Sequence, residues 1–165
     1  MTSTDTHGAR APAAVLRRMR WWDVDPVVQL DAELFGPTAW TAAMLWSELS
    51  GVPQSRDYLV AVDGKVVVGY GGLMTASGES TIQTIGVAPS AQRTGLGRRI
   101  LDELVAAARR RASTWVWLEV SVENAGAQRL YTAAGFEPVA RRRDYYDVGR
   151  DAVVMRCRLT GRARS

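Results

Sequence analysis

The chain has 165 residues, of which 47% are hydrophobic and 23% are charged, proportions that are ordinary for one globular domain. Its formal net charge is +4, and arginine supplies nearly all of the positive charge because Lys65 is the only lysine. The single cysteine, Cys157, cannot form an internal disulfide, and with the single His7 it cannot build a metal cluster. Zinc enzymes, disulfide scaffolds and enzymes with a Ser–His or Cys–His nucleophile are therefore excluded, and we expect no metal.

Small, polar segments lie at the two ends of the chain. Residues 1–13 lack the basic-then-apolar order of a signal peptide and are predicted to form a disordered leader, and residues 161–165 form a basic tail. No segment approaches the roughly 18 apolar residues that a membrane helix requires. We expect a cytoplasmic protein with one domain over residues 14–160 and no membrane partner.

The first half of the domain is predicted to contain a strand, two short helices and three further strands. The first helix is expected to have Asp25 as its N-cap and Pro26 at its first position, and Thr41 is expected to cap the second. Asp63-Gly64 separates two β-rich runs, which is a strong hairpin signal. The predicted ranges are 15–21 for the first strand, 26–35 and 41–49 for the helices, and 58–74 and 80–89 for the hairpin and the next strand.

The second half predicts two more helices and three more strands. A long helix over 96–111 has apolar residues at helical spacing and arginines in its last turn, where the helix dipole favours them. A strand over 115–121 and a helix over 125–134 follow, and Gly135 is expected to close that helix at its C′ position. Strands are predicted around 136–143 and 152–159. The order of elements is that of one mixed α/β domain.

The most informative segment runs Gln92-Arg93-Thr94-Gly95-Leu96-Gly97-Arg98, between a strand end and the long helix. Backbone N–H groups at a helix N-terminus have no intrahelical partner, and the dipole there favours anions. The two glycines allow the backbone to approach a pyrophosphate closely. The segment lacks the Gly-Lys-Ser/Thr ending of a P-loop and the G-x-G-x-x-G of a dinucleotide site. By itself it is equally compatible with a plain left-handed turn.

In its context, this segment resembles the acetyl-CoA loop of the GNAT acetyltransferase superfamily, since Q-x-x-G-x-G follows a strand ending in I-G-V-x-P. The resemblance extends from Val15 to Leu159 and includes WLEV, Asn124 and RLYTAAGFEPV. It implies one GNAT domain with a mixed, mostly antiparallel sheet of six to seven strands and about four helices. It further implies that acetyl-CoA is a co-substrate bound by residues 92–98, by the strand Ile85-Gly86-Val87 and by Asn124, although Asn124 is equally natural as a helix N-cap.

Three features resemble more closely the RimI branch, the ribosomal-protein alanine N-acetyltransferases. They are Phe35 followed by Trp40-Thr41, the pattern LEV-xxx-N ending at Asn124, and RRRDYYDVGRDAVVM over 141–155. Paired tyrosines before a D-A-x-x-M strand are typical of enzymes that hold a peptide N-terminus. The chain departs from the pattern at Ser121, where arginine is usual, at Glu123, where serine is usual, and in a longer loop over 36–39. These departures lie on the acceptor side and affect the choice of acceptor more than the reaction.

Transfer of an acetyl group to an amine requires a base, an oxyanion donor and an acid. The resemblance implies that Glu119 accepts the proton, directly or through a water, and that Tyr131 protonates the departing thiolate. The strand over 85–87 is expected to supply a backbone oxyanion donor. Tyr145 and Tyr146 are predicted to line the peptide slot, and Trp40 to close its other wall. A solvent-facing glutamate and packed aromatics are the purely structural alternatives.

The predicted function is acetyl-CoA-dependent N-alpha-acetylation of protein N-termini, with the N-terminal alanine of a small-subunit ribosomal protein as the expected acceptor. Two alternatives remain open at this point: acetylation of a small-molecule amine, and a non-catalytic acyl-CoA-binding sensor or subunit. The partner is expected to be a protein or peptide N-terminus. Direct nucleic-acid binding is not expected, and the arginine clusters are compatible with a solvated basic surface.

Overall fold

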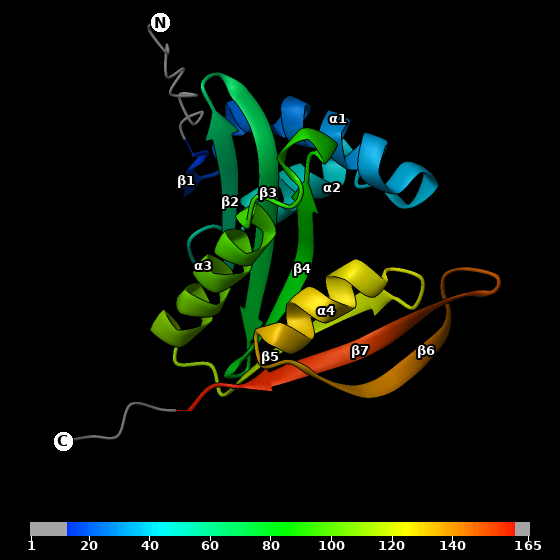
Figure 1. The fold of residues 1–165 in the computed structure, drawn as a ribbon. Coiled ribbons are helices and arrows are strands. Elements are labelled where there is room, and N and C mark those ends of the chain that lie inside the picture. Colours follow the sequence, from blue (N-terminus) through cyan, green and yellow to red (C-terminus); the bar gives the residue numbers. More distant parts are fainter. Residues whose placement is uncertain (1–12, 161–165) are drawn as a thin grey trace, which may run out of the picture.

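The computed structural model describes residues 13–160. They form a seven-stranded sheet with helices on both faces (Figure 1). The strand order is β1-β2-β3-β4-β5-β7-β6, and only the neighbours β4 and β5 are parallel. The predicted α/β class, with a mostly antiparallel sheet and about four helices, is therefore confirmed. The predicted leader and basic tail lie, apart from Ala13, outside the described residues.

The elements occur in the predicted order, and the last two strands are longer than predicted. Among residues 13–160, no helix is long and apolar enough to cross a membrane. The strands are β1 (Val15–Arg18), β2 (Arg56–Asp63), β3 (Val66–Ala76), β4 (Glu79–Val87), β5 (Trp115–Ser121), β6 (Glu137–Asp147) and β7 (Arg150–Arg158), and the α-helices are α1 (Val24–Phe35), α2 (Ala42–Leu49), α3 (Leu96–Arg110) and α4 (Ala125–Ala133).

The predicted start of the first helix is wrong. α1 begins at Val24 with Asp23 as its N-cap, so Asp25 lies inside the first turn. The Asp23 side chain makes no cap hydrogen bond, because its carboxylate accepts two hydrogen bonds from the Arg17 guanidinium, at 2.7 and 2.8 Å, and one from the Arg20 amide. These contacts tie β1 to the start of α1. The strand stops at Arg18 rather than at the predicted residue 21, and Trp21–Asp23 form a 3-10 turn.

Successive residues of β3 point to opposite faces of the sheet, and each face is covered by a different helix. Gly71 faces α3, and a Cβ at this position would lie 2.7 Å from Ile100 and 3.0 Å from Leu104. The missing side chain therefore lets α3 pack directly on the sheet, where Ile100 and Leu104 are fully buried. The preceding residue, Tyr70, points to the opposite face and hydrogen-bonds to Asp31 of α1. Helix α1 consequently covers the face opposite α3.

The two parallel strands pair only over their first residues. Pairing runs from Glu79 opposite Trp115 to Thr81 opposite Trp117, and no pairing is present beyond this point. Figure 1 shows the consequence: β4 runs upward beside β3, whereas β5 turns away beneath α4. The second half of β4 and the second half of β5 therefore face an opening in the sheet, and this opening positions the site.

Candidate functional site

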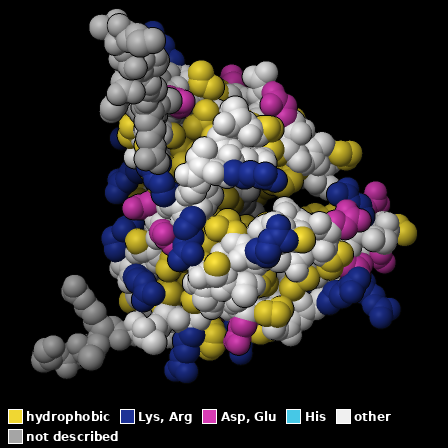
Figure 2. All heavy atoms as spheres, in the orientation of Figure 1, with side chains coloured by type: hydrophobic (Ala, Val, Ile, Leu, Met, Phe, Trp, Pro, Cys, Tyr) yellow, Lys and Arg dark blue, Asp and Glu magenta, His cyan; other side chains and the backbone are white. Residues whose placement is uncertain are grey.

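A cavity of about 250 Å³ lies where β4 and β5 diverge. Side chains from both strands, from α1 and α4, and from the hairpin that joins β6 to β7 line it. An outer cavity of about 660 Å³ shares part of this lining. Figure 2 shows a notch between the part of the surface formed by α1 and the part formed by α4 and this hairpin. Of the predicted site residues, the inner cavity brings together Trp40, Ile85, Glu119, Asn124, Tyr131 and Tyr146.

Glu119 lies on β5 and lines both cavities. Its Oε1 accepts a hydrogen bond of 2.6 Å from Arg142 Nη1 on β6, and 24% of its side chain is exposed. The interaction of the Tyr145 phenol with the nearby Glu119 carboxylate, together with partial burial, raises the pKa of Tyr145 to about 12. The Arg142 guanidinium on β6 therefore orients the carboxylate at the mouth of the cavity.

Tyr131 lies on α4 with only 8% of its surface exposed and lines the inner cavity. Its ring packs against Phe136 at a centroid distance of 6.0 Å. Burial, and secondarily the neighbouring Tyr146, raise the pKa of the Tyr131 hydroxyl to about 12. The residue thus belongs to the core and to the cavity at once, and it keeps its proton at neutral pH.

A bulge in β6 brings both paired tyrosines to the same side. Consecutive residues of a regular strand point to opposite faces. Here the register with β7 shifts between Arg142 and Asp147, and Asp144 adopts a left-handed φ of 51°. Tyr145 and Tyr146 both line the outer cavity as a result, with their rings meeting edge-on at 4.9 Å. Trp40 lines the same cavity from the α1–α2 connection.

The predicted anion loop has two left-handed residues, Arg93 with φ 60° and Gly95 with φ 83°. Gln92 Nε2 donates to the Val87 carbonyl at 3.2 Å, and Thr94 Oγ1 donates to the Ala91 carbonyl at 2.6 Å. These side chains hold the loop against the end of β4. The amide hydrogens of residues 96–98 precede the first i to i−4 hydrogen bond of α3 and therefore have no intrahelical partner.

The side chains around this helix N-terminus leave room beside its backbone. A Cβ on Gly97 would meet Leu130 at 3.5 Å and Val87 at 3.7 Å, which are ordinary contacts. Arg98 turns along the helix and pairs with Asp102 at 2.9 Å. The loop consequently presents backbone donors and the helix dipole to an anion. Among residues 13–160, no group of three or more His, Cys, Asp or Glu side chains could hold a metal ion.

The other predicted cofactor residues also have structural roles. A Cβ on Gly86 would lie 2.3 Å from the Tyr70 ring, so glycine is required here by the close approach of that ring. Asn124 caps α4, with its Oδ1 accepting from the Ala127 amide at 3.0 Å, and it also lines the inner cavity. On its β5 side, β4 is unpaired beyond Thr81, so the backbone of residues 85–87 is open to an extended ligand.

Three residues of the site were not predicted from the sequence: Asp31 and Gln83, which line the inner cavity, and Arg142, which donates to Glu119. Asp31 is 1% exposed, accepts from the Tyr70 hydroxyl and from the Trp40 amide, and so fixes the wall that contains Trp40. A signal for it was present, because it follows the buried Val24 and Val27 at helical spacing on the apolar face of α1. No local pattern marks the other two, which owe their place to strand pairing.

The sequence model of the acetyltransferase (GNAT) family matches residues 17–136 of the chain. Among curated proteins, the N-alpha-acetyltransferase RimI of Mycobacterium tuberculosis is 40% identical over 140 residues, which cover 81% of this chain and 85% of that protein. The [ribosomal protein bS18]-alanine N-acetyltransferase of Escherichia coli is 41% identical over 80 residues, covering 47% of this chain and 54% of that protein.

Among solved structures, a Salmonella typhimurium protein crystallised with its cofactor acetyl-CoA has the same fold. It superimposes with a TM-score of 0.74 over 92% of this chain and 97% of that chain, at 22% identity.

Proposed function

Because the chain belongs to the acetyltransferase (GNAT) family, we propose that it transfers the acetyl group of acetyl-CoA to the α-amine at the N-terminus of a protein. The observation that carries the proposal is the inner cavity, in which a carboxylate, a protonated phenol and an aromatic wall lie where the sheet opens. Glu119 and Tyr131 supply the proton-transfer groups. Trp40, Tyr145 and Tyr146 supply a slot for the acceptor.

The residues present fit acetyl-CoA as co-substrate. The free backbone amides of residues 96–98 suit its pyrophosphate, and the unpaired edge of β4 over residues 85–87 suits an extended pantetheine arm. Asn124, at the cavity end of α4, faces the same space. When bound, the thioester supplies an activated acetyl group. A backbone amide of β4 would donate to the carbonyl oxygen as negative charge develops on it.

Glu119 would accept the proton that the acceptor ammonium must lose before its nitrogen can attack, either directly or through a water. Arg142 holds that carboxylate at the cavity mouth, where the acceptor enters. Tyr131 would give its proton to the departing thiolate. Its pKa of about 12 keeps it protonated at every working pH, and the buried surroundings also make a thiolate more basic than in water.

We propose the N-terminal alanine of a small-subunit ribosomal protein as the acceptor, with the enzyme acting in the cytoplasm. The description of the E. coli relative as a [ribosomal protein bS18]-alanine N-acetyltransferase supports this choice. Two of the departures from the RimI pattern contact each other, since Ser121 Oγ accepts from the Glu123 amide at 3.2 Å. They leave the lining by Trp40 and Tyr146 in place.

A peptide assay tests the proposal and its alternatives. The protein is incubated with labelled acetyl-CoA and short peptides that differ in their first residue, and thiol release and the position of the label are measured. Peptides that begin with alanine should react, and the same peptides blocked at the N-terminus should not. Equal labelling of N-blocked, lysine-containing peptides would contradict an N-terminal acceptor. Reaction with simple amines alone would favour the small-molecule alternative, and no thiol release with any acceptor would favour the sensor.

A further inference from the structure

Gln83 stands at the cavity in a position that parallels Glu119. The last paired residues of the parallel strands are Thr81 and Trp117, and Gln83 and Glu119 follow them by two residues on β4 and β5. Gln83 is the extra residue of a bulge in β4 opposite Gly72 and Leu73, and its side chain contacts Tyr58 and Met74. Gln83 and Glu119 both line the inner and the outer cavity. An acceptor held by Glu119 would consequently lie beside Gln83.

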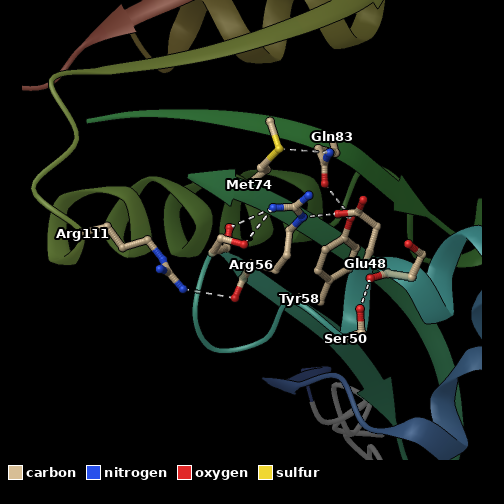
Figure 3. Close-up of polar contacts among 9 residues, drawn as sticks. Glu48, Ser50, Arg56, Tyr58, Met74, Gln83 and Arg111 are labelled. Carbon is tan, nitrogen blue, oxygen red and sulfur yellow. Dashed lines mark hydrogen bonds and ion pairs between the residues drawn. The ribbon is translucent and has the colours of Figure 1, made fainter. Parts of the chain in front are cut away.

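A chain of hydrogen bonds through Tyr58 and Glu48, here called the relay, holds the Gln83 carboxamide (Figure 3). The Tyr58 hydroxyl lies 2.9 Å from Gln83 Oε1 and 3.2 Å from Glu48 Oε2, so its proton is shared between two acceptors. Arg56 in turn pairs with the same Glu48 oxygen at 2.5 Å. Tyr58 is 4% exposed and its ring lies against Gly72, where a Cβ would approach it to 2.3 Å. The phenol therefore cannot shift without moving β3.

The relay engages the amide oxygen of Gln83 and leaves the amide nitrogen with donor capacity. Among the described residues, the hydrogen-bond partner of Nε2 is the Met74 sulfur at 3.9 Å. A thioether is a weak acceptor, and a carboxamide nitrogen carries two hydrogens. Gln83 is half-buried and lines both cavities, so a ligand in the cavity can accept from these hydrogens. A neutral donor of this kind suits a carbonyl oxygen.

We propose that the Gln83 amide donates a hydrogen bond to the carbonyl oxygen of the acceptor's first residue, and so selects α-aminoacyl amines over simple amines. In any peptide this carbonyl is attached to the carbon that bears the reacting nitrogen, so the two groups can meet Gln83 and Glu119 together. Tyr58 acts as a positioning residue, because it binds the amide oxygen and thereby leaves the nitrogen as the group available to the acceptor. The inference rests on the proposed function and specifies what its acceptor must contain.

Steady-state kinetics with an alanine-initiated peptide test this role. Gln83→Met keeps the length of the side chain and removes the donor, so KM for the peptide should rise about 2- to 10-fold, the value of one hydrogen bond, while KM for acetyl-CoA and kcat stay unchanged. Gln83→Glu, which cannot donate when ionised, should behave likewise. Tyr58→Phe should raise the same KM by a smaller factor. Gln29→Met, on the exposed side of α1, is the matched control and should change nothing.

A modified peptide tests whether Gln83 donates to the carbonyl oxygen of the first residue. A peptide with a thioamide as its first linkage offers a weaker acceptor, so it should lose efficiency with the wild-type protein and lose little more with Gln83→Met. Provided that the wild-type protein acetylates peptides, three results would overturn the inference. They are an equal loss with the thioamide in wild type and Gln83→Met, an unchanged peptide KM in Gln83→Met, and a fall in the kcat of Gln83→Met alone. If the wild-type protein acetylates no peptide α-amine, the proposed function fails and this inference fails with it. Thermal melting of each variant separates these results from misfolding.

Discussion

Replacing Glu119 by glutamine separates the role of its charge from that of its shape. The substitution keeps the volume of the side chain and leaves one oxygen that can still accept from Arg142. The side chain lies at the cavity mouth, 24% exposed, so no core packing is lost. We therefore expect Glu119→Gln to fold and melt like the wild-type protein and to bind acetyl-CoA normally.

The expected loss is in turnover, because an amide cannot take a proton from the acceptor. A general base contributes roughly 100- to 10,000-fold, or about 3 to 5 kcal/mol of barrier. The α-amine of a peptide has a pKa of about 7.7 to 8.0, so below this range the neutral amine rises about tenfold per pH unit. Turnover by the variant should follow that rise, and the deficit relative to wild type should narrow as the pH increases towards 8.

The assay measures kcat from pH 6 to 9 by thiol release, with calorimetry for acetyl-CoA binding. Glu137→Gln is the matched control, because Glu137 is also a strand glutamate paired with an arginine, Arg156 at 3.3 Å, but does not line either cavity. It should turn over like wild type. If Glu119→Gln also keeps wild-type kcat at pH 6 with an unchanged melting curve, Glu119 is not the base and the catalytic assignment is wrong.

The remaining predictions concern Tyr131, which lines the same cavity, and Gly97, in the first turn of α3. Tyr131→Phe should lower kcat by about 100-fold or more and leave acetyl-CoA binding intact, and its effect should be less than additive with that of Glu119→Gln if both groups serve one step. Because burial raises the pKa of Tyr131 to about 12, wild-type kcat should show no loss between pH 8 and 10, where an ordinary phenol begins to deprotonate; a fall in a pH–rate profile centred near 10 would contradict this. Gly97→Ala should bind acetyl-CoA nearly as wild type in calorimetry, since a Cβ meets only ordinary contacts at 3.5 Å or more, whereas Gly97→Val should bind it much more weakly by crowding the approach to the loop backbone. Normal binding by Gly97→Val would show that the pyrophosphate lies elsewhere.

Local chemistry in the sequence was sufficient to place most of the elements. The Thr41 cap is confirmed by its hydrogen bond from the Met44 amide at 3.2 Å, and Gly135 closes α4 with a φ of 96°. Such signals involve residues within one turn of each other, so the sequence carries them directly. The first helix shows the limit of this reasoning. Asp25 has the right residue type for a cap, but a contact from β1 to Asp23 decided where the helix starts.

The family pattern, also readable in sequence, named the residues that line the site, among them Glu119, Tyr131 and Asn124. It could not say how they would be held. Asn124 both caps its helix and faces the cavity, and Tyr131 is both core and lining, so alternatives that looked exclusive in sequence coexist in space.

Tertiary structure alone decided the polar contacts that give the cavity its chemistry. Arg142 reaches Glu119 across 23 residues of sequence, and Tyr58 reaches Gln83 across 25. Each pair is set by strand order, by register and by the twist or bulge of the strands, which depend on the packing of the whole sheet rather than on neighbours along the chain. The bulge in β6 turns two consecutive tyrosines to one side, against the alternation that a strand sequence predicts.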